Sequence, residues 1–160
     1  MYEVLAKRLV EANVVQRRLD GHKFEKEFSA AIENKYFLLR LHTPNTGYSG
    51  LTQPADFLVI GDKVSLVETK ETTKDVFYIS QMEQLDEMLD YLDQKFKLKG
   101  KTLKKSQYLV IVHFIDRKVI KVITGEYAKQ LYENKKGFTY LDTEAQEFQS
   151  MKDLKENLIL

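Results

Sequence analysis

Residues 54–72, PADFLVIGDKVSLVETKET, place three charged side chains within an otherwise apolar pair of strands. Asp56 stands directly before the apolar run at 57–60, and Glu68 and Lys70 interrupt the end of the run that begins at Val64. Strand interiors favour branched and aromatic side chains and seldom hold charges. The stretch therefore predicts a β-hairpin that carries either a functional site or an ion pair on a sheet edge.

The length of the hairpin turn decides whether the two carboxylates share a face. Opposed residues of an antiparallel pair point to the same face, and a one-residue slip reverses this. A two-residue turn beginning at Gly61 sets Asp56 against Val67, whereas a three-residue turn sets Asp56 against Glu68. Lys70 then lies on the same face as Glu68, because strands have a period of two. We predict the three-residue turn or an equivalent bulge.

Two carboxylates in opposed positions, about 5 Å apart at Cβ, repel each other. One of them then has a raised pKa unless a cation lies between them. Mg²⁺ suits such a place, because it binds one or two carboxylates together with waters and phosphate oxygens. A nearby lysine can hold or help to deprotonate an attacking water. The set therefore suits metal-assisted phosphodiester hydrolysis.

The rest of the chain alternates helical and extended patterns. Helices are predicted at 2–18, 21–34, 82–97, 126–133 and 143–160, and strands at 36–41, 108–115 and 119–124. The third helix is expected to begin with a capping box from Ser80 to Glu83. Helices before and between strands predict an α/β sandwich around a mixed sheet.

The composition fits one globular domain. The 160 residues are 43% hydrophobic and 31% charged, with a net charge of +1 and no cysteine. No apolar run approaches the ~20 residues needed to span a bilayer, and the first residues do not resemble a secretion signal. We expect a cytoplasmic protein without disulfides. Three scattered histidines do not predict zinc, and His113 is expected to be a hydrogen-bonded core or interface residue.

Several segments resemble a known nuclease family. PAD at 54–56 and ETK at 68–70 resemble the PD-(D/E)XK signature of the restriction-endonuclease-like superfamily, with one extra residue after the proline. Within that superfamily, three more segments are similar to RecU-type Holliday junction resolvases. They are GHKFE at 21–25, VETKET at 67–72 and MEQ at 82–84.

The similarity covers roughly residues 21–133. It implies a restriction-endonuclease-like α/β fold, which is a three-layer sandwich with a central mixed β-sheet flanked by helices. The chain then forms a single nuclease domain over 1–160. It comprises an N-terminal helical arm at 1–20, the core at 21–133 and a C-terminal extension at 134–160.

The resemblance implies roles for the charged residues of the hairpin. Asp56 and Glu68 would bind the metal, with the carbonyl of Thr69. The metal would be Mg²⁺, with Mn²⁺ as a substitute. Lys70 would position or activate the attacking water.

Two helical residues complete the implied catalytic set. Glu25 would reach the site from the first helix, directly or through water, and Gln84 would support the lysine or the water. The alternatives are an ordinary exposed helix glutamate and a surface glutamine.

Two segments are candidates for DNA contact. The loop at 43–54 stands where RecU-type enzymes carry a longer stalk, and its polar side chains can contact phosphates. The stretch 95–105 holds six lysines and no acid, although such a run also suits a solvated surface. The candidate residues are His42, Thr43, Asn45, Thr46, Tyr48, Thr52, Lys97, Lys99, Lys101, Lys104 and Lys105.

Residues and resemblance together predict a Mg²⁺-dependent endodeoxyribonuclease that resolves Holliday junctions in DNA recombination and repair. Its substrate is branched DNA. Two symmetric cuts favour a homodimer, in a bacterial or phage-infected cell. The alternatives are another nuclease of this fold that cuts duplex or flap DNA, a junction-binding protein that does not cleave, and a structural domain with an edge ion pair.

Overall fold

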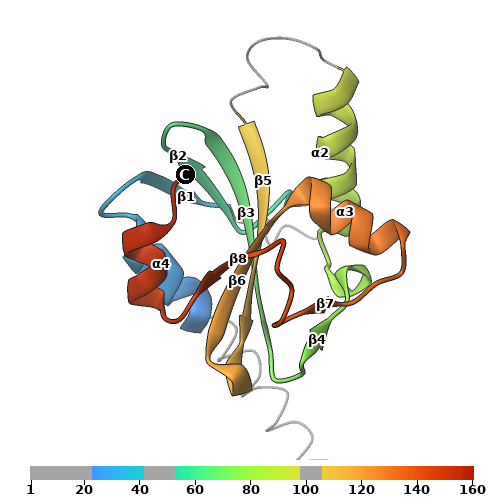
Figure 1. Ribbon diagram of the computed structural model, residues 1–160. Coiled ribbons are helices and arrows are strands. Elements are labelled where there is room, and N and C mark those ends of the chain that lie inside the picture. Colours follow the sequence, from blue (N-terminus) through green and yellow to red (C-terminus); the bar gives the residue numbers. More distant parts are fainter. Residues whose placement is uncertain (1–22, 42–52, 98–105) are drawn as a thin grey trace, which may run out of the picture.

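The computed structural model describes residues 23–41, 53–97 and 106–160, except for the side chains of 95–97. Their main sheet is mixed and has the order β1-β2-β3-β5-β6-β8 (Figure 1). β3 and β5 run parallel, and the other neighbours run antiparallel. The strands are β1 (Phe37–Arg40), β2 (Phe57–Ile60), β3 (Val64–Thr72), β5 (Ser106–Phe114), β6 (Val119–Thr124) and β8 (Gln146–Phe148).

Helices cover both faces of this sheet (Figure 1). One face, the α4 face, carries the first helix (residues 23–32) and α4 (Met151–Asn157). The other, the α2 face, carries α2 (Leu85–Lys97) and α3 (Gly125–Glu133). The described residues thus form an α/β fold of helix, sheet and helix layers, as the sequence predicts.

Side-chain alternation assigns the residues of the central strands to the two faces. On β3, Val67 packs in the core of the α4 face, so Glu68 points toward the α2 face. The residue beside Glu68 on β5 is Val110, which packs in the core of the α2 face. β5 is buried along most of its length because helices lie on both sides of it. Glu68 therefore lies in the interior of the molecule.

The predicted hairpin register is confirmed. Phe57 pairs with Val67 and Ile60 with Val64, which leaves a three-residue turn at 61–63. Continued by one position, this register sets Asp56 opposite Glu68. The turn begins with Gly61, whose position allows no side chain. A Cβ there would overlap the carbonyl oxygen of Leu160 and the ring of Tyr36.

The predicted capping box at the start of α2 is wrong. Ser80 lies exposed within a 3-10 helix, η1 (Ile79–Gln81), and α2 begins only at Leu85. The carbonyl of Gln84 accepts the first helical hydrogen bond, from Met88 N at 3.0 Å. Ile79 and Met82 are buried, so core packing holds this segment in a tighter turn before the helix begins. The helix ends at Lys97, as predicted.

The C-terminal part of the chain is more varied than the helix predicted at 143–160. β8 pairs with β6, placing Phe148 beside Ile120, and only Met151–Asn157 is helical. Ser150 caps this helix by accepting a hydrogen bond from Asp153 N at 3.1 Å. Leu154, Leu158 and Leu160 pack in the core of the α4 face. The strand β8 and the helix α4 are each too short to show a periodic pattern of their own. The sequence therefore did not distinguish the strand from the helix.

The remaining expectations agree closely where the structure describes the chain. The strands at 36–41, 108–115 and 119–124, and the helix at 126–133, are found within two residues of their predicted bounds. The predicted helix at 21–34 is helical over 23–32. A small antiparallel pair, β4 (Val76–Phe77) with β7 (Phe138–Thr139), was not expected. The helix predicted at 2–18 lies outside the described residues.

Within the described ranges, no helix combines the length and the apolar character needed to cross a membrane.

Candidate active site

Asp56 is held by donors from the neighbouring strand. Its Oδ2 accepts hydrogen bonds from the backbone N–H and the hydroxyl of Thr69, both at 2.8 Å. Gln53 Nε2 approaches Oδ1 at 3.4 Å. The pairing of β2 with β3 stops at Val67, so the carboxylate of Asp56 provides the acceptor that the N–H of Thr69 would otherwise lack. Asp56 is thus fixed in place at the end of β2.

Glu68 is buried with few partners. Its side chain has no exposed area, and neither carboxylate oxygen accepts a hydrogen bond from the described residues. Lys70 Nζ lies 2.8 Å from Oε1 as an ion pair. Buried polar atoms are almost always hydrogen-bonded in native proteins. Oε2 of this buried carboxylate therefore has a capacity for a partner that the described residues do not supply.

The electrostatics of the pair follow from burial and charge. Burial, and then the negative charge of Asp56, raise the pKa of Glu68 to about 7, although Lys70 acts in the opposite direction. Burial alone would lower the pKa of Lys70, but Glu68 and Asp56 together hold it above its usual value. Lys70 therefore stays protonated at neutral pH, whereas the pKa of Glu68 lies close to neutral pH.

Tyr108 supports the turn that presents Asp56. Its hydroxyl donates to the carbonyl of Pro54 at 2.8 Å, and its ring is fully buried. Burial, followed by the charges of Glu68, Asp56 and Glu87, raises the pKa of this phenol well above its usual range. The phenol therefore remains a hydrogen-bond donor at every physiological pH. No motif in the sequence marks this role.

Glu25 has a different environment from the one expected of it. Its carboxylate is ion-paired with Arg40 of β1. Arg40 is paired with Phe57, whose side chain packs in the core of the α4 face. Among the described residues, no three His or acidic side chains form a group that could hold a metal ion. The structure thus does not bring Glu25 into such a group with Asp56 and Glu68.

The start of α2 contributes two further buried oxygens. Gln84 Oε1 and Glu87 Oε2 are both buried and accept no hydrogen bond from the described residues. Gln84 was predicted as a site residue, whereas Glu87 was not among the predicted site residues. The available signal was its spacing: Glu87 follows Gln84 by three residues and precedes Tyr91 by four, so the three share one helix face.

His113 behaves as expected of a core residue. Its Nδ1 lies 3.0 Å from Oε1 of Glu71, and its ring stacks on Phe24 with centroids 5.1 Å apart.

The DNA-contact candidates cannot be placed from the described residues. The loop residues from His42 to Thr52, and the lysines from Lys99 onward, lie outside the described ranges. Lys97 is the last residue of α2, and its side chain is likewise not described. Their assignment to DNA contact stays a prediction.

The donor set suits a hard divalent cation. Asp56 and Glu68 provide carboxylate oxygens, and no donor among the described residues forms a hydrogen bond with either oxygen of Glu68. Mg²⁺ is commonly held by only one or two carboxylates, with waters and substrate oxygens completing its coordination. The residues present therefore fit Mg²⁺ or Mn²⁺, with Asp56 and Glu68 as ligands.

No protein-family model matches the chain, and no curated protein is significantly similar to it in sequence.

Proposed function

We propose that this protein is a Mg²⁺-dependent endodeoxyribonuclease with a restriction-endonuclease-like fold, and that it resolves Holliday junctions. The observation that carries the proposal is the arrangement on β2 and β3. Asp56 is set opposite Glu68 by the hairpin register, and Lys70 is ion-paired to Glu68. The Glu68 carboxylate is buried and accepts no hydrogen bond from the residues that the structure describes. A structural ion pair on a sheet edge explains this less well, because β3 is an interior strand.

In this proposal each residue of the hairpin has one task. Asp56 and Glu68 hold Mg²⁺ or Mn²⁺, with the carbonyl of Thr69. When bound, the ion supplies Lewis acidity to the scissile phosphate and lowers the pKa of water. Lys70, protonated at neutral pH, orients the attacking water and stabilises the negative charge that develops on the phosphate. Gln84 supports the lysine or the water from the start of α2.

Binding of branched DNA is assigned to the two segments predicted from the sequence. The lysines at 95–105 contact the phosphate backbone, and the loop at 43–54 approaches the junction. Phosphate contacts position a protein on DNA without reading its sequence, which suits an enzyme that selects DNA by shape.

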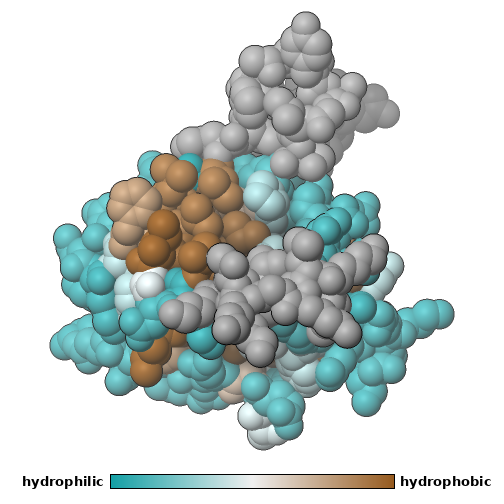
Figure 2. Space-filling model, turned by 90° about the horizontal axis from the view of Figure 1, so that it is seen from above, coloured by the Kyte–Doolittle hydropathy of each residue, from teal (hydrophilic) through white to brown (hydrophobic). Residues whose placement is uncertain are grey.

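A homodimer would provide the two sites that symmetric cutting requires. An apolar row crosses three strands, because Phe37 pairs with Ile60 and Ile60 with Val64. These side chains remain 63%, 44% and 42% exposed, and Figure 2 shows an apolar area bordered by hydrophilic side chains. The row lies on the same face as Glu68, so we propose that a second copy packs there.

Light scattering should show a dimer for wild type and a monomer for Ile60→Lys, with exposed Leu141→Lys as control.

The test of the activity is cleavage of a synthetic four-way junction beside linear duplex of the same sequence, in Mg²⁺. Wild type should make symmetric nicks in the junction alone. The rate of cleavage should be roughly 10³-fold lower in Lys70→Ala. The exposed Lys74→Ala is the matched control and should cut as wild type does. Cutting of every substrate would instead indicate a general nuclease. Junction binding without cutting, in Mg²⁺ or Mn²⁺, would contradict the enzymatic proposal.

A further inference from the structure

Glu87 stands out on α2 because one of its oxygens is buried without a partner. Oε2 accepts no hydrogen bond from the described residues, although an exposed carboxylate one residue earlier, Asp86, shows that the helix offers water nearby. Leaving a buried acceptor unsatisfied costs free energy. This cost is removed if Oε2 of Glu87 accepts a hydrogen bond from a ligand or a water in the active state of the protein.

The packing of α2 on β5 places Glu87 along the sheet. α2 runs antiparallel to β5 (Figure 1), and Tyr91 lies over the beginning of that strand. Its ring is 5.9 Å from the ring of Tyr108, and its hydroxyl donates to Ser106 Oγ at 2.7 Å. Four helix residues advance about 6 Å, nearly the length of two strand residues. Glu87 therefore lies near the level of Val110.

Val110 is the direct neighbour of Glu68 in the parallel pair of β5 with β3. Glu87 and Glu68 thus approach the same part of the α2 face, one from the helix layer and the other from the sheet. The electrostatic environment of Tyr108 agrees with this placement, because Glu68, Asp56 and Glu87 all raise the pKa of its phenol.

We propose that Glu87 is the third carboxylate of the nuclease site and acts on the bound divalent cation through water rather than by direct contact. The inference rests on the proposed nuclease function. We propose contact through water because, among the described residues, no three acidic or His side chains form a group that could hold a metal ion directly. Glu87 is then a positioning residue: it accepts hydrogen bonds from the waters that complete the coordination shell. Glu25, paired with Arg40, is not needed for this task.

Binding of Mn²⁺ to the full chain, measured by the electron paramagnetic resonance of free Mn²⁺, tests the inference without relying on activity. Loss of a group that supports a metal through hydrogen bonds typically weakens affinity 10- to 100-fold, and Glu87→Gln should show a loss of that size. The matched control is Asp86→Asn, an exposed acid on the same helix turn, which should bind as wild type does. Glu87→Asp keeps the charge at shorter reach and should recover part of the affinity.

The outcomes separate the two proposals. If wild type binds Mn²⁺, Asp56→Asn abolishes binding and Glu87→Gln leaves it unchanged, the role of Glu87 is overturned and the nuclease site stands. If folded wild type binds no Mn²⁺, both proposals fall. Should Glu87→Gln not fold, Glu87→Asp decides the matter, because affinity equal to wild type would overturn the inference.

Discussion

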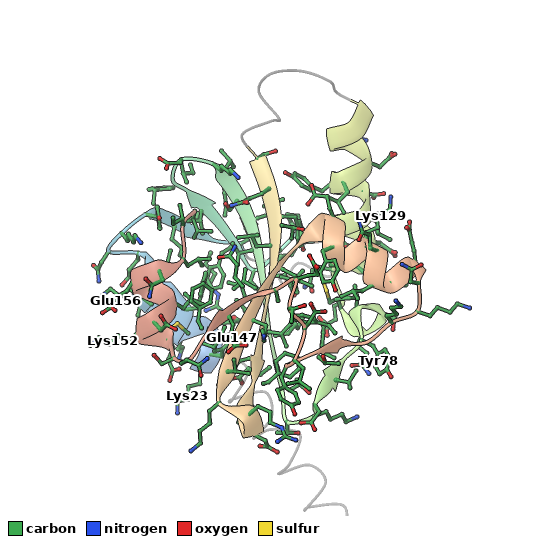
Figure 3. All side chains as sticks on the ribbon, viewed as in Figure 1. Lys23, Tyr78, Lys129, Glu147, Lys152 and Glu156 are labelled. Carbon is green, nitrogen blue, oxygen red and sulfur yellow. The ribbon has the colours of Figure 1, made fainter. Side chains whose placement is uncertain are left out.

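Glu68 and Lys121 are both charged side chains buried in the central sheet, but the described part of the chain supplies hydrogen bonds to only one of them. Lys121 of β6 is 3% exposed and donates to the carbonyl of Asp142 at 3.1 Å and to the carboxylate of Glu147. Glu147 belongs to β8 and is labelled in Figure 3. Glu68 is also buried, and within the described ranges its one charged partner at close contact is Lys70. Lys121 thus forms a closed structural contact between β6, β8 and the segment between them. Glu68 retains the capacity to bind something else.

The largest expected difference is in activity. Glu68→Gln removes a charge that the proposed site needs for metal binding, so cleavage of a four-way junction should fall by at least about 10³-fold. Glu147→Gln removes the partner of the other buried charge and should leave the rate of cutting per folded molecule unchanged. Rates are compared under single-turnover conditions in Mg²⁺. Equal losses of cleavage rate in Glu68→Gln and Glu147→Gln would contradict the proposal that Glu68, unlike Lys121, belongs to a functional site.

The next largest effect is the dependence of stability on pH. Glu68 has a pKa of about 7 in the folded protein, against 4.5 for an ordinary glutamate. The folded state therefore binds more protons between these values, and its free energy of unfolding should fall as pH rises from 5 to 8. The loss for the metal-free protein is about 3 kcal/mol. It is measured by urea denaturation in a chelator at each pH.

The same measurement on Glu68→Gln provides the control. The amide does not ionise, so this variant should lose that pH dependence and be more stable than wild type at pH 8. Glu147→Gln should retain the wild-type slope. A wild-type free energy of unfolding that does not change across this pH range would show that burial does not raise the pKa of Glu68.

A smaller effect of opposite sign is expected for the satisfied charge. Glu147→Gln leaves Lys121 buried beside a neutral side chain and should lower the free energy of unfolding by about 1–2 kcal/mol, less than for a fully buried pair because Glu147 is 46% exposed. Lys121→Met removes the buried charge itself and should cost less than Glu147→Gln. Urea denaturation at pH 7 measures both. A larger loss of stability in Lys121→Met than in Glu147→Gln would mean that the packing of the Lys121 methylene groups, rather than its charge, determines stability at this position.

The smallest effect concerns the support of Asp56. Tyr108→Phe removes the hydrogen bond to the carbonyl of Pro54 without changing the buried ring, and should cost about 1 kcal/mol of stability. Because the turn before Asp56 is then held less firmly, junction cleavage should fall by a few-fold. Tyr127→Phe is the control, since its hydroxyl donates to Asp142 instead. An unchanged cleavage rate in Tyr108→Phe would limit the role of this hydroxyl to stability.

The sequence was informative where strand alternation and a glycine-containing turn act together. Gly61, Asp56 and Glu68 were enough to predict the register, because only an odd turn sets the two carboxylates opposite each other. The sequence could not show that Thr69 would bind Asp56, since that contact depends on where the pairing of β2 ends. For Glu87 the sequence offered a partial signal: its spacing places it on the helix face of Gln84 and Tyr91, but only the packing of α2 on β5 shows that this face meets the sheet.

The turn that sets this register is completed by a distant part of the chain. Asp62 N donates to the carbonyl of Leu160 at 3.0 Å, and Leu160 N donates to the hydroxyl of Tyr36, 124 positions earlier in sequence. Contacts between residues so far apart close slowly during folding, because the chain entropy of a long loop must first be overcome. The contact of the hairpin turn with the C-terminal residue is therefore expected to form late in folding. In the proposed nuclease, the hairpin that carries Asp56 and Glu68 would gain its full support only at that stage.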